Sequence, residues 1–255
     1  MDALPQPVLW VVVFAAGIAA GLVNTLAGGG SLVTLPVLMI VVGLPAPIAN
    51  GTSRVAVLVQ SLTAAATYRR AKLGGGKLAL RLAPFVCAGS LAGAWLATRA
   101  SPGSLKRTIG GVLLACVPLV IFSARLQVGA RAVPRRVPPA LVAAVALAVG
   151  VYSGFLQAVV GIPILLLLVW GLGVDAVEGN HTKVLVIAAS MAVALTVFAH
   201  AGQVDYVYGG ISAAGQALGA WIGARLVIKK GLTVIRWALA LTVTASALQM
   251  LGVFG

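Results

Sequence analysis

The sequence predicts an all-α, polytopic membrane protein, and its composition, its charge and the spacing of its apolar runs indicate this. Of the 255 residues, 61% are hydrophobic and only 9% are charged, whereas a soluble protein carries about a quarter charged residues. At roughly 20 residues per crossing, the chain has room for about eight to ten helical segments. The net charge of +14 fits cytoplasmic loops that face anionic lipid, and no basic segment has the interleaved aromatic residues that would suggest nucleic-acid binding.

The apolar runs fall into two sets of five expected helices. The segments 31–43 and 161–172 are too short to span, since each is about 20 Å long against a hydrocarbon core of about 30 Å. Each follows a break in the preceding helix, so we expect a re-entrant hairpin or a kinked spanning unit there, and the sequence leaves both open. The first set is 8–27, 31–43, 49–71, 78–98 and 104–124, and the second is 139–157, 161–172, 178–201, 205–228 and 232–254.

The two sets resemble each other in sequence. "GAWLATR" at 93–99 recurs as "GAWIGAR" at 219–225, and "NGTSRVAVL" at 50–58 resembles "GNHTKVLVI" at 179–187. Because each set contains an odd number of crossings, the second copy is inverted across the membrane. We therefore predict two inverted-topology repeats with broken or re-entrant helices. Their bounds are 1–124 for the first repeat, 125–139 for a cytoplasmic linker and 140–255 for the second repeat.

The distribution of basic residues predicts the orientation. With the 69–81 loop in the cytoplasm and the sides alternating from there, 13 of the 18 Lys and Arg residues are cytoplasmic and 3 are external. The positive-inside rule favours this arrangement. We expect a multi-pass protein of the cell inner membrane with both termini external. Arg54 and Lys183 are the two basic residues that remain, and each is near the start of a helix.

The stretch "NTLAGGGSLVTLP" at 24–36 breaks an apolar helix. Unpaired backbone at membrane depth is tolerated only where it is buried in protein or lines a cavity, and glycine lets the backbone approach a ligand closely. The free N–H groups of the following half-helix attract an anion. The alternative interpretation is close helix packing by small residues. The candidate substrate-binding residues here are Asn24, Thr25, Gly28, Gly29, Gly30 and Ser31.

The equivalent break in the second half is "YSGFLQAVVGIP" at 152–163, which lacks two adjacent glycines. We include Ser153 and Gln157 as candidate polar contacts. Gln157 would be costly facing lipid, so we expect it to face the interior. It serves there either the substrate or a structural hydrogen bond between helices.

Arg54 and Lys183 stand at matching positions of the aligned segments, each after hydroxyl-bearing residues. Basic side chains near helix ends often snorkel to the headgroups, but this does not explain why both copies keep the base. Two cations and two half-helix N-termini would form a converging anion site. Its further polar contacts are Thr52, Ser53, Asn180, His181 and Thr182.

The acidic residues support an anion as the substrate. Asp2, Asp175, Glu178 and Asp205 all lie at termini or loop edges, whereas a cation transporter holds a carboxylate within the membrane. A coupling proton or ion would use Glu178, Asp205, His181 or His200. Cys87 and Cys116 lie in apolar stretches without nearby ligand-type residues. We therefore expect no metal, no cofactor and no enzymatic activity.

Several of these segments resemble the TauE/SafE family of membrane transporters. The segments "NTLAGGGSLVTLPVL", "GLPAPIANGTSRVA" and "ATYRRAKL" resemble the first half of sequences in this family. The stretch 179–206 resembles the second half through Asn180, Lys183, Ser190, Phe198, Gly202 and Val204. The chain departs from the family at "LQAVVG", which lacks the usual glycine-rich turn, and at Ser190, where the family usually has Asn.

This resemblance implies a secondary transporter, acting as an exporter of sulfite, sulfoacetate or other organosulfonates by alternating access. The alternatives are a passive anion channel and a membrane scaffold that transports nothing. The sequence leaves the identity of the anion, the coupling ion and the oligomeric state open.

Overall fold

The computed structural model describes residues 5–112 and 137–230, and every regular element among them is helical. Four helices are long and apolar enough to cross a membrane, namely α1, α4, α8 and α9. This confirms the predicted all-helical membrane protein. The elements are α1 (Gln6–Ala27), α2 (Ser31–Pro36), η1 (Val37–Val41), α3 (Ala46–Arg70), α4 (Gly76–Arg99), a helix at 102–112, α6 (Pro139–Phe155), α7 (Gly161–Leu166), η2 (Leu167–Gly171), α8 (Ala176–His200) and α9 (Tyr206–Lys230).

Short polar or proline-containing stretches set where these helices begin. Pro5, Pro45 and Pro138 directly precede α1, α3 and α6, where the fixed φ of proline suits a helix start. The Asp175 carboxylate accepts hydrogen bonds from the backbone amides of Val177 and Glu178 at the start of α8. The expected helices within the described residues therefore form close to their expected bounds, because proline and the capping residues act locally. The expected helix 232–254 and the part of 104–124 after residue 112 lie outside the described residues.

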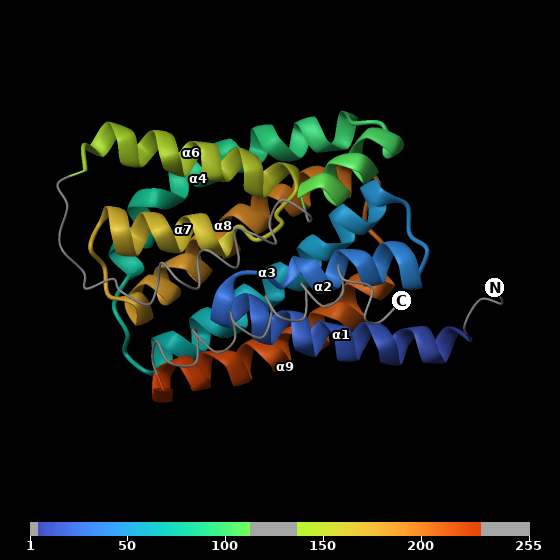
Figure 1. Cartoon of the computed structure of the whole chain (residues 1–255), viewed down its shortest axis with the longest axis horizontal. Helices are drawn as coiled ribbons and strands as arrows, with labels where there is room; N and C mark the ends of the chain where they lie inside the picture. The colour runs from blue at the N-terminus through green and yellow to red at the C-terminus, as the bar shows by residue number, and fades with distance from the viewer. Residues whose placement is uncertain (1–4, 113–136, 231–255) are drawn as a thin grey trace.

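The same succession of elements occurs twice in the described residues. The helices α2, α3 and α4 begin at residues 31, 46 and 76, and α7, α8 and α9 begin at residues 161, 176 and 206, each 130 residues later. Figure 1 shows that corresponding helices run in opposite directions along the long axis. An inverted repeat would have this arrangement, and the repeat itself stays a prediction. The linker 125–139 lies almost entirely outside the described residues, so the division of the chain at 124 and 140 stays a prediction.

The short helices turn back along the helices that precede them. The pair α2–η1 reverses direction after α1 and packs beside it, and α7–η2 does the same after α6 (Figure 1). Both units are therefore helical hairpins, which settles the geometry that the sequence left open. The hairpin of the first half enters from one end of the bundle, and the hairpin of the second half enters from the other end.

Small residues pack the first helix of each hairpin against the opposite half. α1 contacts α9, and α6 contacts α4. A Cβ atom at Gly21 would lie 2.2 Å from the Gln216 carbonyl oxygen, and one at Gly154 would lie 2.1 Å from the Ser90 carbonyl oxygen. Four G-x-x-x-G motifs line these contacts, at 17–21, 215–219, 89–93 and 150–154, as in close helix pairs of other membrane proteins.

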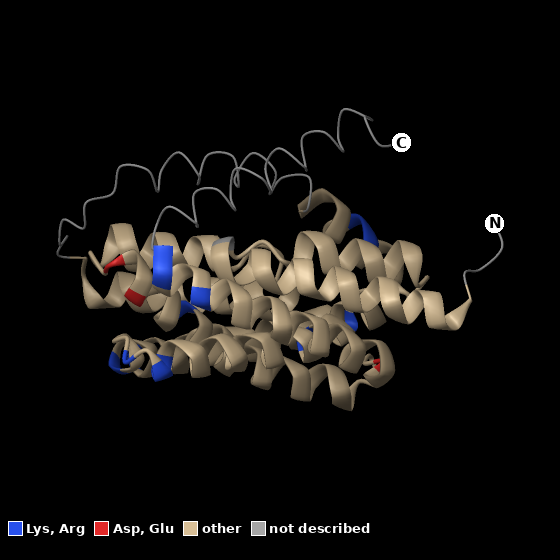
Figure 2. Ribbon diagram, turned by 90° about the horizontal axis from the view of Figure 1, so that it is seen from below, with Lys and Arg blue, Asp and Glu red and all other residues tan. Residues whose placement is uncertain are grey.

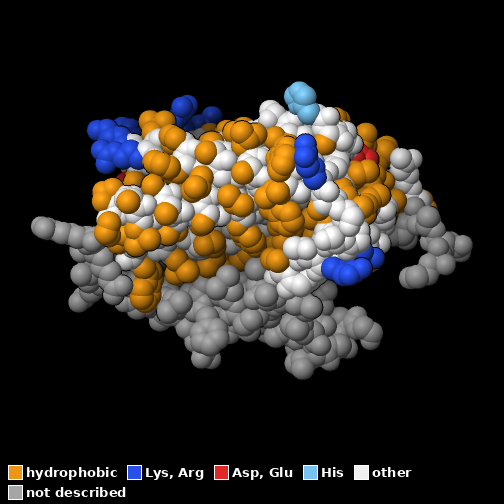
Figure 3. Space-filling model, turned by 90° about the horizontal axis from the view of Figure 1, so that it is seen from above, with side chains coloured by type: hydrophobic (Ala, Val, Ile, Leu, Met, Phe, Trp, Pro, Cys, Tyr) orange, Lys and Arg blue, Asp and Glu red, His pale blue; other side chains and the backbone are white. Residues whose placement is uncertain are grey.

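Apart from the buried Arg54 and Lys183, the charged residues of the described chain lie at the two ends of the bundle. Figure 2 shows the described Asp and Glu residues only at these ends, and Figure 3 shows a broad hydrophobic band between two groups of basic side chains. The chain direction places more basic residues at the end where α3 and α9 finish than at the opposite end. The end where α3 and α9 finish carries Arg69, Arg70, Lys72, Lys77, Arg81, Arg225, Lys229 and Lys230. The opposite end carries Arg99, Lys106 and Arg107.

The tips of the two hairpins meet at Gly28 and Gly161. Gly28 has a φ of +83°, and a Cβ atom there would lie 2.5 Å from the Gly161 Cα atom. We expect Gly28→Ala to lower the free energy of unfolding in detergent by about 3 kcal/mol, because it adds left-handed strain to overpacking. Gly110→Ala is the matched control, since nothing lies within 4 Å of a Cβ atom there. Equal stability of the two variants would contradict this close approach.

Candidate functional site

The two chain breaks form a buried polar centre at the middle of the molecule. The Ser31 hydroxyl donates a hydrogen bond of 3.0 Å to the Gln157 carbonyl oxygen, which joins the first break to the second. A Cβ atom at Gly30 would lie 2.4 Å from the Ala20 carbonyl oxygen, whereas one at Gly29 would have room. The packing interpretation therefore holds for Gly28 and Gly30, and the substrate-binding role of this stretch stays a prediction.

Lys183 caps the end of α1, which belongs to the other half. Its ammonium group donates hydrogen bonds to the carbonyl oxygens of Asn24 at 3.3 Å and Thr25 at 3.1 Å. These carbonyls lie in the last turn of α1, where the helix dipole is negative. The Asn24 oxygen also accepts a hydrogen bond of 2.9 Å from the Gly28 amide, whereas no backbone amide of the described residues reaches the Thr25 oxygen. The Lys183 side chain is 0% exposed. An ammonium group has three N–H donors, so one donor of Lys183 has no acceptor among the described residues.

Arg54 caps the end of α6 in the corresponding way. Its guanidinium group donates to the carbonyl oxygens of Ser153 and Gly154, and to the backbone oxygen and the side-chain Oδ1 of Asn50. A fifth contact is the Met191 sulfur atom at 3.7 Å, and the group stacks over the Phe198 ring at 5.0 Å. A guanidinium has five N–H donors, so all the donors of Arg54 are used within the protein.

The helix starts correct the alignment of these two cations. Asn50 and Asn180 each stand at the fifth position of their helices, α3 and α8, so Arg54 lies one residue further along its helix than Lys183 does. Asn50 donates a hydrogen bond of 2.9 Å to the Phe155 carbonyl oxygen. Asn180 is equally buried, but neither its amide nitrogen nor its oxygen has a hydrogen-bond partner among the described residues. The two halves thus share the same helix framework, but the buried Asn side chain is hydrogen-bonded in the first half and has no described partner in the second.

A second polar layer lies deeper along α3 and α8. Gln60 accepts a hydrogen bond from Asn24 and donates one of 3.2 Å to the Thr25 hydroxyl. In the other half, the hydroxyls of Ser153 and Ser190 lie 2.8 Å apart, and Ser90 donates to the Ser190 carbonyl oxygen. The sequence interpretation missed Asn50, Gln60 and Ser90. A polar residue within an apolar helical run was the signal that could have found them.

Four of the predicted contacts do not join this centre. Thr52 accepts from the Asp205 amide at 2.9 Å beside the start of α9. Thr182 and His181 instead contact the carbonyl oxygens of Gly75 and Gly74, before α4. These residues hold the loops that precede α9 and α4. Ser53 bonds only to the Asn50 carbonyl oxygen within its own helix.

The second break is built without the glycines of the first. Gln157 and Val159 take up left-handed conformations, with φ values of 63° and 57°. A β-branched residue rarely adopts this conformation, so Val159 is held by its surroundings, where it is 1% exposed. The Gln157 side-chain oxygen has no partner among the described residues.

Both breaks expose backbone donors inside the protein. The amides of Gly29 and Gly30, and those of Ala158, Val159 and Val160, make no hydrogen bond within residues 5–112 and 137–230. All five residues are buried. Buried N–H groups without a partner are rare in proteins and call for water or a ligand. In the described part of the chain, no group of three His, Cys, Asp or Glu residues could hold a metal ion.

Comparison with known proteins gives the family. A sequence model described as "Sulfite exporter TauE/SafE" matches residues 13–250, which includes both hairpins. The chain belongs to the TauE/SafE family. It is therefore a membrane transporter by family, and the predicted resemblance is confirmed.

Curated relatives of this TauE/SafE protein carry transporter names. The chain is 30% identical to "Probable membrane transporter protein ORF9" of Sinorhizobium sp, over 93% of this chain and 90% of the relative. It is 31% identical to "Probable membrane transporter protein YfcA" of Escherichia coli K12, over 91% and 85% of the two chains. A "Probable membrane transporter protein" of Haemophilus influenzae is 28% identical over 89% of each chain. No solved structure matches the chain.

The saturated contacts of Arg54 lead to a stability prediction. Arg54→Gln would remove most of the donors to Ser153 and Gly154, and each buried acceptor without a partner costs about 1–3 kcal/mol. We expect the free energy of unfolding in detergent to fall by about 3 kcal/mol. Arg99→Gln is the control, because Arg99 is exposed and stacks only on Trp95. Unchanged stability of Arg54→Gln would show that Arg54 does not hold the α6 end.

Proposed function

We propose that this protein is a secondary transporter that binds a small anion where the two hairpin tips meet, with Lys183 as its principal charge. The unused third donor of Lys183 carries the proposal. Lys183 lies one helical turn after the unpartnered Asn180 side chain, and a Cβ atom at Gly161 would lie 3.3 Å from its Cδ atom. The cation is thus directly beside the tip of the second hairpin.

The donor set of this centre favours an anion. Among the described residues it combines one buried ammonium group, the Asn180 amide and the unpaired backbone amides of both breaks. The described acidic residues lie at helix starts: Asp175 and Glu178 at α8, and Asp205 before α9. None is placed within the hairpin centre, where a cation would need a carboxylate.

We propose sulfur oxyanions as the substrates, with sulfite, sulfoacetate and other organosulfonates as the candidates and export as the direction. The family description names sulfite export. A sulfonate or sulfite group presents three oxygens, which suits a site whose N–H and O–H donors come from several directions. Alternating access follows in this proposal from rocking of one half against the other, as in other inverted-repeat transporters. The site residues are buried from both sides, as in an occluded state.

The distribution of charge supports a cytoplasmic location for the end of the bundle that carries Arg69, Lys77 and Lys230. In this orientation α1 begins on the external side. We propose an inner-membrane location on the same grounds. A coupling proton would use Glu178, Asp205, His181 or His200, all of which lie near the ends of the bundle.

Replacing Lys183 tests the charge. Lys183→Gln keeps a donor for the α1 carbonyls but removes the cation, so we expect the variant to fold. Sulfite counterflow in proteoliposomes should fall at least about tenfold, because the anion loses one charge-assisted hydrogen bond of roughly 1.4 kcal/mol or more. Lys106→Gln, at the far end of the bundle, is the control. Full counterflow by Lys183→Gln would exclude Lys183 from the site.

The same assay separates the carrier from the two alternatives. Saturable flux that external sulfite accelerates identifies a carrier, and unsaturable flux without such acceleration identifies a passive channel. A scaffold would show neither flux nor a sulfite-dependent shift in melting temperature.

Replacing Asn180 tests the position of the anion. Asn180→Asp introduces a negative charge where no hydrogen bond is lost, so we expect a folded protein whose apparent affinity for sulfite falls at least about tenfold. Asn50→Asp is the matched variant of the other half, where Arg54 neutralises the new carboxylate. Equal affinities of the two variants, measured by thermal shift against sulfite concentration, would place the anion elsewhere.

A further inference from the structure

A groove at the basic end of the bundle is separate from the hairpin centre. It has a volume of about 680 Å³ and is lined by α3, by α4 with the loop before it, and by α8. Its walls are almost entirely apolar, and two of the leucines that line it, Leu62 and Leu80, are 54% and 76% exposed. The groove therefore opens toward the surface that faces lipid, and its walls do not suit a small hydrophilic anion.

The groove is polar at one end only. On α3, Arg69 lies at the helix end and Leu62 lies two turns deeper, and on α8, His181 lies near the helix start and Ala189 lies two turns deeper. At 1.5 Å per residue, this lining extends about 12 Å from the charged end toward the bilayer centre. α4 contributes Ala83 to the deeper part. The groove thus changes from charged to apolar along the expected membrane normal.

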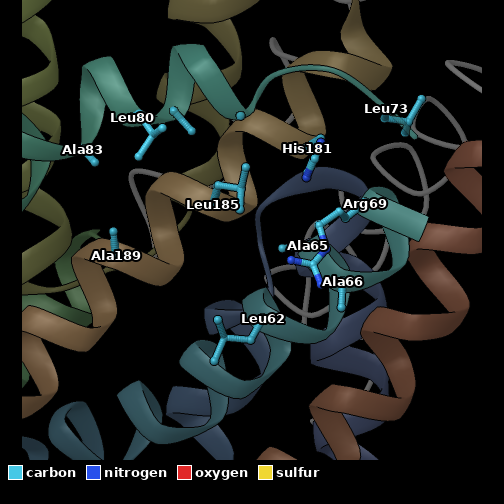
Figure 4. A pocket seen from close by; sticks show the side chains of 12 residues that line it. Leu62, Ala65, Ala66, Arg69, Leu73, Leu80, Ala83, His181, Leu185 and Ala189 are labelled. Carbon is cyan, nitrogen blue, oxygen red and sulfur yellow. The ribbon is translucent and has the colours of Figure 1, made fainter. Parts of the chain in front are cut away.

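Arg69 is available to a ligand in this groove. Figure 4 shows its side chain directed toward the space between α3 and α8, alongside Ala65 and Ala66. It makes no hydrogen bond or ion pair with any other described residue. The same end of the bundle also carries Arg70 at the end of α3, Lys72 in the following loop and Lys77 in the first turn of α4. Its described carboxylates are those of Asp175 and Glu178 at the start of α8.

We propose that the groove binds an anionic phospholipid, with one acyl chain between α3, α4 and α8 and with its phosphate on Arg69. The charged end selects a negative headgroup, because basic residues at the cytoplasmic surface attract anionic lipid. The apolar part of the groove is suited to a lipid acyl chain, because Leu62, Leu80 and Leu185 form its walls. His181 forms part of the floor, where its ring lies 5.7 Å from that of Tyr68. The bound lipid would stabilise the packing of α3 against α8.

Native mass spectrometry of the detergent-purified protein tests this with phosphatidylglycerol and phosphatidylcholine of identical acyl chains. We expect phosphatidylglycerol to bind about fivefold more tightly, the value for one basic contact at the membrane surface. Arg69→Gln should abolish this preference, and Lys106→Gln, the control at the other end, should keep it. Ala66→Trp should weaken both lipids by filling the groove.

Three results would overturn the proposal. These are equal binding of both lipids to the wild-type protein, an unchanged preference in Arg69→Gln, and equally tight binding of glycerol phosphate, which has the headgroup charge without the chains. Melting temperatures show that each variant is folded. Loss of sulfite counterflow in Ala66→Trp with lipid binding unchanged would identify the groove as a substrate entrance instead. Because the lipid measurement involves no transport, its outcome is independent of the transport proposal.

Discussion

The structure depends on the reciprocal capping of two helix ends, those of α1 and α6, that stop in the buried centre of the bundle. The Thr25 carbonyl of α1 and the Ser153 and Gly154 carbonyls of α6 receive no hydrogen bond from a backbone amide of the described residues, and hydrocarbon offers no water in its place. Lys183 supplies donors to α1, and Arg54 supplies donors to α6. Each cation comes from the opposite half, so neither hairpin is satisfied until both halves are packed. The same contacts that compensate for the broken helices therefore hold the two halves together.

The proposed binding site lies where the two halves depart from symmetry. Both halves share hairpins, G-x-x-x-G contacts and an Asn at the fifth position of the long helix. Arg54 is saturated and Asn50 is bonded, whereas Lys183 keeps a donor and Asn180 has no partner among the described residues. A framework needs every buried polar group satisfied, but a binding site has to keep some of them for its ligand. The second half supplies these free groups, although its chain break lacks the glycines of the first.

The helices and the buried cations could be predicted from the sequence, but several polar roles could not. Proline and glycine mark the helix boundaries locally, and a basic residue in an apolar run must find a buried partner or reach a headgroup. The partners of Arg54 lie about a hundred residues away in the chain, so no local pattern indicates them. Thr52 and Thr182 have the residue types of a binding site, yet the loops before α9 and α4 use their hydroxyls.

The sequence by itself determined an all-helical membrane protein with two broken helices, a basic end and two cations without nearby carboxylates. These properties follow from composition and short-range pattern, because burial in lipid requires apolar helices and penalises unpaired charge. Only the tertiary structure decided that the breaks are hairpin turns, that their tips touch at Gly28 and Gly161, and that the two cations differ in their free donors. Those outcomes depend on which carbonyls come within reach after packing, and that is a property of the assembled helices.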